Sequence, residues 1–308
     1  MIPLRQALDD YLTMRRGLGF KLDRAAKLLT QFLCYLEEAG ADTVAVEQAL
    51  AWARLPAGAD RSWWSYRLSV VRGFAAYLKT LDPTTEVPAA ELLPWRRRRA
   101  TPYLYTDAEI AALITAAGTL RFPLRVATYQ TLIGLLAVTG MRVGEAIRLD
   151  RNDLDFEHEL LVVRDTKFGK SRELPLHPTT AQALRGYLQQ RDRLQPPPNT
   201  PALLISPAGT RLLYSNVHST FRQLRRHAGL RPRSTSCRPR IHDLRHTFAV
   251  RTLLDAYRTD ADVQTRLPLL STYLGHVDPS ATYWYLSAAP ELLALAGQRL
   301  ERHLEGRS

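Results

Sequence analysis

Residues 267–286 read LPLLSTYLGHVDPSATYWYL, and this stretch determines how the rest of the chain is interpreted. A short apolar helix is predicted to end at Gly275, because glycine is the residue that most often ends a helix. His276 follows, and Tyr285 comes nine residues later within an aromatic cluster that also contains Tyr283. Aromatic side chains at this density usually pack in a core. A packing role is therefore the default interpretation of either tyrosine.

Several basic side chains upstream of Tyr285 form a chemically unusual combination with it. They are Arg142, Lys167, His242 and Arg245, to which His276 adds a second imidazole. A tyrosine hydroxyl can attack phosphorus, and arginines can hold the charge that builds on the oxygens. A lysine or histidine can protonate the leaving oxygen. The set has what is needed to cut a phosphodiester bond, and nothing in it is typical of a metal site.

Two members of this set also have ordinary explanations. Arg142 follows a glycine turn, and Glu145 lies three positions later on the same helical face, where it could orient the guanidinium. A surface Arg–Glu pair would look the same. Lys167 lies at the tip of a hairpin that two strand-like stretches, 160–164 and 172–176, predict. A solvated turn lysine is the alternative to a proton donor that reaches into a cleft.

Positive charge is concentrated in residues 222–251. This segment contains nine arginines and one acidic residue, Asp243, whereas a solvated helix face normally mixes its signs. We therefore expect phosphate contacts from Arg222, Arg225, Arg226 and Arg240. His242 and Arg245 lie on adjacent turns of one predicted helix and could contact one phosphate from the same side. His246 is next to Arg245 but points about 100° away from it on the helix, and a structural role is predicted for His246.

The composition favours a polyanionic partner. The net charge is +12 and the pI is about 10.0, which favours nucleic acid or an acidic membrane surface over a merely basic enzyme. The longest apolar run, residues 132–138, is too short to span a bilayer. No basic amphipathic helix with a large apolar face stands out. The two cysteines, Cys34 and Cys237, are far apart, which fits a reducing cytosol. We predict a soluble, cytoplasmic protein with no membrane partner.

A chain of 308 residues is long enough for two domains. Residues 1–81 have a helical pattern, and Arg61, Arg67 and Arg72 are predicted to be available to solvent or phosphate. Residues 82–103 contain four prolines and are predicted to form an interdomain linker. The linker includes four consecutive arginines, which are either a solvated tether or a further contact with the DNA backbone: Arg96, Arg97, Arg98 and Arg99.

Residues 104–308 are predicted to form the second domain, and the whole chain is predicted to be mainly α with a small antiparallel β-sheet. Residues 106–109 have a capping-box pattern, which indicates that a helix begins there. A later helix is predicted to end near Gly140, and the region from about 215 to 301 is mostly helical. Leucines at helical spacing predict a tail helix over 291–308, packed either on its own core or on a neighbouring protomer.

The order, spacing and chemistry of these residues resemble the tyrosine recombinases, the phage-integrase type of site-specific recombinase. The matching positions are Arg142 after Thr-Gly-Met, Lys167 in the β-turn, His242 and Arg245 in His-x-x-Arg, His276 in Leu-Gly-His, and Tyr285 at the usual offset. The motifs cover residues 105–290, and the stretch 267–286 most resembles integrases of bacterial transposable elements. Two features depart from the pattern. About 31 residues separate the second arginine from Leu-Gly-His, and Tyr283 offers a second hydroxyl.

The resemblance implies a helical, SAM-like core-binding domain and a mixed α/β catalytic domain that together clamp double-stranded DNA. It implies that Tyr285 forms a 3′-phosphotyrosyl link, which the 5′-hydroxyl of a partner strand then attacks, without cofactor or metal. Arg142 and Arg245 would bind the non-bridging oxygens, and Glu145 would support Arg142. The acid would be Lys167, the base His242, and a further phosphate donor His276.

The resemblance also implies partners. The tail helix 291–308 would dock on a neighbouring protomer in a homotetramer on paired DNA sites, sister recombinases are further candidate partners, and the protein would be associated with the nucleoid. Integration, excision or transposition of a mobile element is the expected role. The alternatives are an Xer-like resolvase of replicon dimers, a type IB topoisomerase, and an architectural DNA-binding protein whose active site has decayed.

Overall fold

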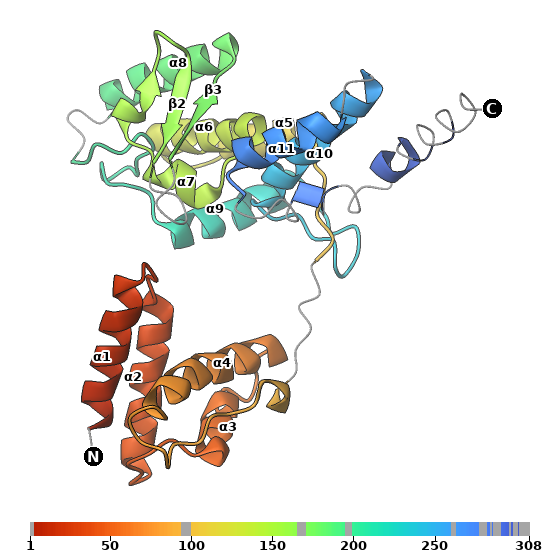
Figure 1. The fold of residues 1–308 in the computed structure, drawn as a ribbon. Coiled ribbons are helices and arrows are strands. Elements are labelled where there is room, and N and C mark those ends of the chain that lie inside the picture. Colours follow the sequence, from red (N-terminus) through yellow and green to blue (C-terminus); the bar gives the residue numbers. More distant parts are fainter. Residues whose placement is uncertain are drawn as a thin grey trace. The chain divides into compact units, whose positions relative to one another are not determined.

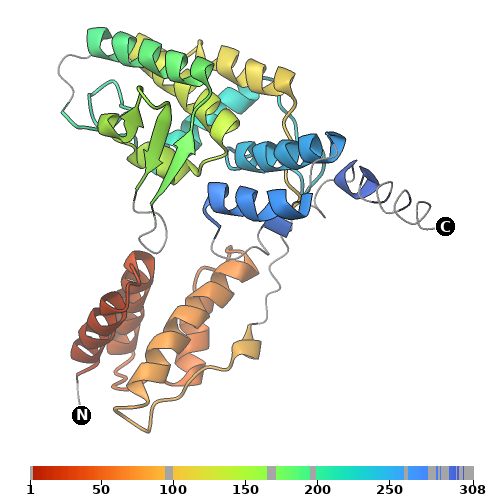
Figure 2. The same cartoon turned by 45° about the horizontal axis from the view of Figure 1, so that its top comes forward.

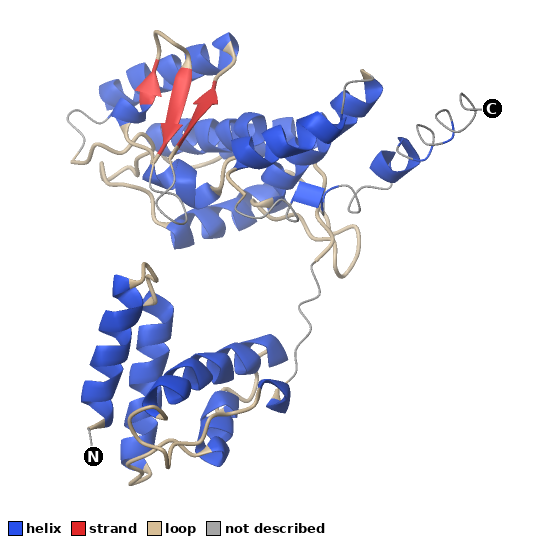
Figure 3. Cartoon of the chain, in the orientation of Figure 1, coloured by secondary structure: helices blue, strands red, loops and turns tan. Residues whose placement is uncertain are grey.

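The chain folds into two compact units, Met1–Arg99 and Ala100–Ser308, in a computed structural model. The structure describes residues 3–93, 100–164, 171–194, 199–259, 263–276, 282, 283, 285, 291–295, 297 and 301. The first unit is helical, and the second combines helices with a three-stranded antiparallel sheet (Figures 1 and 3). The predicted class, mainly α with a small antiparallel sheet, is confirmed.

The helices of the first unit enclose an apolar core. They are α1 (Leu4–Gly17), α2 (Asp23–Glu38), α3 (Val46–Arg54), α4 (Arg61–Leu78) and a short 3-10 helix, η1 (Ala90–Leu92). Apolar residues at helical spacing face inward, and Phe32, Trp52 and Phe74 are almost completely buried. Helix α4 begins at Asp60, whose carboxylate accepts a hydrogen bond from the Ser62 N–H at 2.7 Å.

Arg67 was predicted to face solvent or phosphate, and that prediction is corrected by its position in this core. The residue is only 7% exposed. Its guanidinium carbon lies 3.6 Å from the centre of the Trp52 ring, and its Nη2 donates to the Trp52 carbonyl at 2.8 Å. Helical spacing indicated the face of α4 on which Arg67 lies but not that α3 packs against that face. Arg67 therefore leaves the set of predicted phosphate contacts.

Arg72 holds the segment after α4 against the first unit. Its Nε donates to the Pro88 carbonyl at 2.7 Å, and its Nη2 donates to the Ala89 carbonyl at 2.9 Å. Val87 in the same segment packs against the helical core. Residues 82–93, which the prolines assigned to the linker, thus pack on the first unit, because arginine bonds to their carbonyls replace the hydrogen bonds that a helix would supply.

The second unit is organised around helix α6. Its elements are α5 (Asp107–Ala117), α6 (Pro123–Thr139), α7 (Val143–Arg148), η2 (Arg151–Asp153), β1 (Leu154–Asp155), β2 (Leu160–Val163), β3 (Arg172–Pro175), α8 (Pro178–Leu194), α9 (Tyr214–His227), α10 (Asp243–Arg258) and α11 (Val263–Leu274). Helix α6 packs against α5, α8 and α10. The predicted capping box at the start of α5 is confirmed, with reciprocal bonds between Thr106 and Glu109.

The sheet joins the two predicted strands to a third. Its order is β1-β2-β3, and both pairings are antiparallel. Leu161 lies opposite Leu174, and both side chains are buried, so one face of the hairpin packs on the core. The predicted strands over 160–164 and 172–176 therefore match β2 and β3. Lys167 lies outside the described residues.

Helices α10 and α11 pack side by side, as both views of the ribbon show (Figures 1 and 2). Helix α11 ends at Gly275, which has the left-handed φ of +67° that the sequence predicted for a helix-ending glycine. The apolar cluster between these helices also buries Tyr285 and Leu292. Glu291 pairs with Arg258 of α10 at 2.6 Å. The first residues of the predicted tail thus pack on their own unit.

Candidate active site

Five separate segments of the second unit converge on the candidate site. They are the turn between α6 and α7, the start of β3, the start of α10, the end of α11 and the segment that carries Tyr285. The turn after α6 depends on Gly140, whose φ is +60° and where a Cβ would lie 2.5 Å from the Phe248 ring. Both glycine turns expose backbone carbonyls toward arginine side chains, so the backbone itself orients the guanidinium groups.

Arg142 is the first of these arginines. It immediately precedes α7, where its N–H donates to Glu145 Oε2 at 2.9 Å and its Nη1 donates to Glu145 Oε1 at 2.7 Å. Its Nη2 donates to the Gly275 carbonyl at 3.1 Å. The side chain is 34% exposed, so it remains reachable from solvent. The predicted Arg142–Glu145 contact is therefore present, and Glu145 is buried rather than on the surface.

Arg172 is a member of the cluster that the sequence analysis missed. It lies at the start of β3, is 11% exposed, and its Nη2 donates to Glu145 Oε2 at 2.8 Å. Its Nε donates to the Tyr273 carbonyl at 2.8 Å. An arginine next to a hairpin normally suggests a solvated strand end. Nothing in the local spacing of Arg172 distinguishes it from such an arginine.

Two arginines keep Glu145 ionised. Burial raises the pKa of this carboxyl, but hydrogen bonds and charge from Arg172, followed by the bonds from Arg142, outweigh burial and lower the pKa to about 2. Glu145 is therefore a carboxylate throughout the physiological range. It can orient Arg142 but cannot act as a proton donor.

Arg245 is almost completely buried, at 2% exposure. Its Nη1 donates to the Gly140 carbonyl at 2.9 Å and its Nη2 to the Leu274 carbonyl at 2.7 Å. Burial, followed by repulsion from Arg142, lowers the pKa of this guanidinium to about 10, while Tyr285 acts in the opposite direction. Arg245 remains a cation at neutral pH, and it connects the two glycine turns to α10.

Two imidazoles, those of His246 and His276, lie beside the aromatic ring of Tyr285, and a third, that of His242, contacts His246. His242 and His246 meet edge to face with ring centres 4.9 Å apart, and the His246 ring centre lies 5.4 Å from that of Tyr285. The His276 ring stacks at 6.1 Å from Tyr285, and its Nδ1 shares a 2.7 Å hydrogen bond with the Thr282 hydroxyl. His246, which was assigned a structural role, thus lies directly beside the candidate nucleophile.

The two tyrosines of the opening stretch have different surroundings. Tyr285 is 2% exposed and lies in the imidazole cluster, whereas Tyr283 is 56% exposed. The structure therefore brings Tyr285 together with Arg142, His242, Arg245 and His276. The remaining predicted catalytic residue, Lys167, lies outside the described residues.

The arginines predicted to contact phosphate fall into three groups. Arg61, Arg222 and Arg226 are exposed. Three others have backbone or acidic partners: Arg72 donates to the Pro88 and Ala89 carbonyls, Arg225 Nη1 donates to the Pro239 carbonyl at 3.4 Å, and Arg240 Nη2 pairs with Asp243 at 2.9 Å. Arg96, Arg97, Arg98 and Arg99 lie outside the described residues.

The imidazole pKa values lead to a prediction about stability. Burial is the main cause that lowers the pKa of His242 to about 4, of His246 to about 3 and of His276 to about 4. Nearby arginines add to this effect. Unfolded histidines titrate near pH 6.5, so as the pH falls from about 6.5 to about 4 the unfolded chain takes up protons that the folded chain excludes.

The free energy of unfolding should therefore fall as the pH is lowered through this range. Urea unfolding at about pH 7 and about pH 5.5 measures the change. A His246→Asn variant should show a smaller fall than the wild type. An identical pH dependence in the two proteins would contradict the role assigned to this imidazole.

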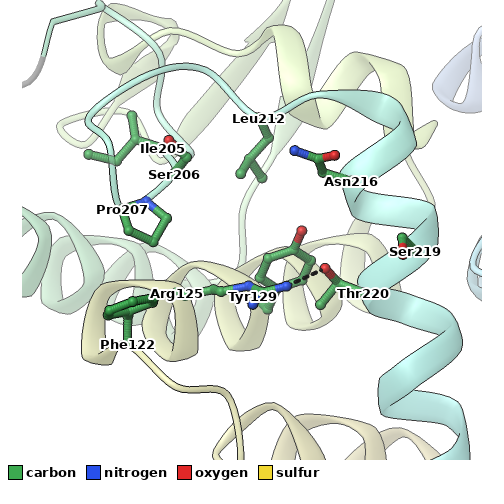
Figure 4. Close-up of a pocket in the computed structure, with 10 residues that line it drawn as sticks. All are labelled: Phe122, Arg125, Tyr129, Ile205, Ser206, Pro207, Leu212, Asn216, Ser219 and Thr220. Carbon is green, nitrogen blue, oxygen red and sulfur yellow. Dashed lines mark hydrogen bonds between the residues drawn. The ribbon is translucent and has the colours of Figure 1, made fainter.

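A pocket elsewhere in the second unit is unrelated to this cluster. It lies between the start of α6, residues 205–212 and α9, and its volume is about 280 Å³ (Figure 4). None of the predicted site residues lines it. Arg125, the one charged residue among its lining side chains, donates to the Thr220 hydroxyl at 2.9 Å. The chemistry therefore lies with the arginine and imidazole cluster.

Comparison with known proteins identifies the fold and the family. The model of the phage integrase family matches residues 104–291, which is more than half of the chain and includes every segment of the cluster. The chain belongs to the phage integrase family. Members of this family are tyrosine-type site-specific recombinases that transfer DNA strands, and the chain is an enzyme of this class.

Relatives cover the whole chain, including the helical unit. The integrase/recombinase y4rB of Sinorhizobium fredii is 45% identical over 314 residues, covering 100% of both chains. The tyrosine recombinase XerC of Mycobacterium leprae is 28% identical over 293 residues, covering 91% of this chain and 93% of the other. Among solved structures, the Tn1549 transposon integrase in complex with transposon right-end DNA has a TM-score of 0.64 at 17% identity. That match covers 98% of this chain and 99% of the integrase, and it shows the shared fold.

None of the helices that the described residues form combines the length and the apolar character needed to cross a bilayer.

Proposed function

We propose that this chain cleaves and rejoins DNA through a 3′-phosphotyrosyl link on Tyr285. The observation that carries the proposal is the position of Tyr285, beside two imidazoles and close enough to Arg245 for their charges to interact. The tyrosine oxygen forms a bond to phosphorus while the bond to the 5′-oxygen breaks, and the 5′-hydroxyl leaves with a proton. A 5′-hydroxyl of a partner strand reverses the step, so no external energy source is needed.

The arginines supply charge to the reacting phosphate. Arg142 and Arg245 each use part of the guanidinium on backbone carbonyls and keep further N–H donors for the non-bridging oxygens. Because these contacts hold the groups in place before DNA binds, little reorganisation is needed when charge builds on the oxygens. Glu145 supports Arg142 without contacting the phosphate.

The imidazoles handle protons in the neutral form. With a pKa of about 4, His242 is free to accept the tyrosine proton at neutral pH. When His276 Nδ1 accepts a hydrogen bond from the Thr282 hydroxyl, the ring proton is on Nε2, which can donate to a phosphate oxygen. Lys167 is proposed as the acid for the 5′-oxygen on the basis of its place in the sequence pattern.

The first unit and the linker would add DNA contacts outside the cleavage site. Residues 1–81 are proposed as a DNA-binding domain, 82–103 as the connection and 104–308 as the catalytic domain. Exposed arginines such as Arg61, Arg222 and Arg226 are suited to phosphate contacts that position the duplex without reading its sequence. The proposed location is the cytoplasm, on the nucleoid.

A role in moving a mobile element is the proposed biological function. The 45% identity with an integrase/recombinase over the full chain supports it. The 28% identity with XerC over most of the chain favours one alternative, the resolution of replicon dimers. Covalent protein–DNA adducts recovered from cells and sequenced would decide. Adducts at the ends of an element support the first role, and adducts at one chromosomal or plasmid site support the second.

The tail gives a prediction about assembly. Leu292 is 1% exposed and packs on its own unit, so a deletion from residue 291 would damage the catalytic core. A chain that ends at Leu295 retains this contact. We expect it to bind one DNA site with unchanged affinity and to form paired-site complexes at least about tenfold less well, because the proposed contact with a neighbouring protomer is lost. Native gel electrophoresis with one DNA site measures the affinity, and with two sites it measures the formation of paired-site complexes. If the shortened and the full chain form paired-site complexes equally well, the tail does not have a docking role.

A further inference from the structure

Arg172 connects three parts of the candidate active site. Its Nη2 and Nη1 donate to the two oxygens of Glu145, at 2.8 and 3.3 Å, and its Nε donates to the Tyr273 carbonyl at 2.8 Å. Each oxygen of Glu145 therefore has one bond from Arg172 and one from Arg142. The carboxylate is held between two guanidinium groups, and Arg172 uses all three of its guanidinium nitrogens in the bonds to Glu145 and Tyr273.

The contacts form a closed ring. Starting from Arg172, it passes through Glu145 to Arg142, from Arg142 to the Gly275 carbonyl at 3.1 Å, and along the backbone to Tyr273, which returns to Arg172. A closed ring of directional bonds fixes the relative position of its members better than separate pairs do. It includes Arg142 and the residue immediately before His276.

We propose that Arg172 is a positioning residue, which sets the guanidinium of Arg142 and the turn before His276 for the scissile phosphate. The inference rests on the proposed cleavage by Tyr285. Arg172 does not contact the DNA itself in this proposal. It acts through Glu145 on one side and through the Tyr273–Gly275 backbone on the other.

The backbone at Gly275 is shaped around this side chain. A Cβ at Gly275 would lie 2.8 Å from Arg172 Nη1, closer than real Cβ atoms come to a neighbour, and 3.1 Å from its guanidinium carbon, which is a tight contact. The φ of +67° also disfavours any side chain there. The flat guanidinium thus lies directly against the peptide that precedes His276. A lysine would retain the charge but could not bind Glu145 and Tyr273 with the same planar fork.

Single-turnover cleavage tests this proposal. The substrate is a nicked duplex that carries a site recovered from covalent adducts and traps the covalent complex, with protein in excess. At neutral pH, Arg172→Met should lower the rate of trapping about 100-fold, with DNA affinity within about threefold of the wild type. Arg172→Lys should recover about tenfold of this loss, because it restores charge without the fork.

The pH profile separates positioning from a merely structural role. Without Arg172, burial of Glu145 is opposed mainly by Arg142, so the pKa of this carboxyl should rise. His242, immediately before α10, and Arg245 of α10 also interact electrostatically with Glu145. Cleavage by Arg172→Met should therefore fall as the pH drops from about 8 to about 5, because protonation releases Arg142. The double variant Arg172→Met/Glu145→Gln should lack this fall.

Arg211 provides a matched control. Its Nη1 donates to the carbonyls of Ile147 and Leu149 at 2.8 and 3.2 Å, and its Nη2 pairs with Asp150, so it too binds one carboxylate and backbone carbonyls next to α7. Arg211→Met should lower the unfolding temperature without changing the cleavage rate of the folded protein or its pH profile. Rates are therefore corrected for the folded fraction.

The outcomes distinguish the two proposals. If Arg172→Met traps DNA within about threefold of the wild-type rate, or if its pH profile equals that of the double variant, Arg172 does not position the site. If the wild type traps no DNA on any recovered site, the proposed function itself fails, whatever the variants do.

Discussion

Replacing Tyr285 by phenylalanine is expected to abolish covalent capture of DNA while duplex binding stays near normal. The change removes one oxygen from a side chain that is 2% exposed and packed against His246 and His276, so the ring contacts survive. Without the hydroxyl there is no nucleophile, and the loss should be on the order of 10⁴-fold or more. Denaturing gel electrophoresis of the protein with a nicked substrate detects the covalent complex, and a gel shift measures binding.

Tyr283→Phe is the matched control for this experiment. Tyr283 lies two residues away and is 56% exposed, outside the imidazole cluster. The Tyr283→Phe variant should trap DNA at the wild-type rate. Covalent capture by the Tyr285→Phe protein, together with its loss in Tyr283→Phe, would transfer the nucleophile to Tyr283.

Arg245→Lys should lower cleavage by about a hundred- to a thousand-fold, or about 3–4 kcal/mol of transition-state stabilisation. Lysine retains the positive charge, but its single ammonium cannot reproduce the bonds to the Gly140 and Leu274 carbonyls and still present donors to the phosphate. A buried carbonyl without a partner costs about 1–3 kcal/mol, so stability should fall as well. Single-turnover cleavage and urea unfolding measure the two effects separately.

Arg251→Lys on the same helix provides the comparison. Arg251 also bonds a backbone carbonyl, that of Tyr105 at 2.8 Å, and pairs with Asp107, but it is not part of the cluster. The Arg251→Lys variant should have a lower free energy of unfolding without a comparable loss in the rate of cleavage. A cleavage rate for Arg245→Lys within about tenfold of the wild type would show that the fork geometry of Arg245 is unimportant.

The residues brought together in the cluster were accessible from the sequence because each occupies a short, ordered motif. Gly140 and Gly275 indicated turns, and the Arg142–Glu145 spacing indicated a contact along one helix face; these are local features that the backbone alone determines. The choice between Tyr283 and Tyr285 rested on spacing, and the structure places Tyr285 in the cluster. The capping box, the hairpin strands and the mainly helical class were predicted for the same reason.

The residues that were missed or misplaced depend on what packs across a face. Arg67 has the helical position of a surface residue, but α3 brings Trp52 over it and turns a charged side chain into part of the core. Arg172 looks like a strand-end charge until the turn before His276 is placed against it. His246 lies about 100° away from Arg245 on a helical wheel, and the segment with Tyr285 brings this second face into the site. Such tertiary neighbours are not encoded in local spacing.

The closed ring of arginine bonds also determines when the enzyme can become active. Two of its links span large distances in the chain, 133 residues from Arg142 to Gly275 and 101 from Arg172 to Tyr273, and Arg245 bonds the neighbouring Leu274 carbonyl. Contacts of such long range form late in folding. Until residues near the C-terminal end of the domain have left the ribosome, the carbonyls that hold all three arginines are missing. We therefore expect a nascent or truncated chain to lack the positioned arginines, so the reactive site is completed only after most of the domain has been synthesised.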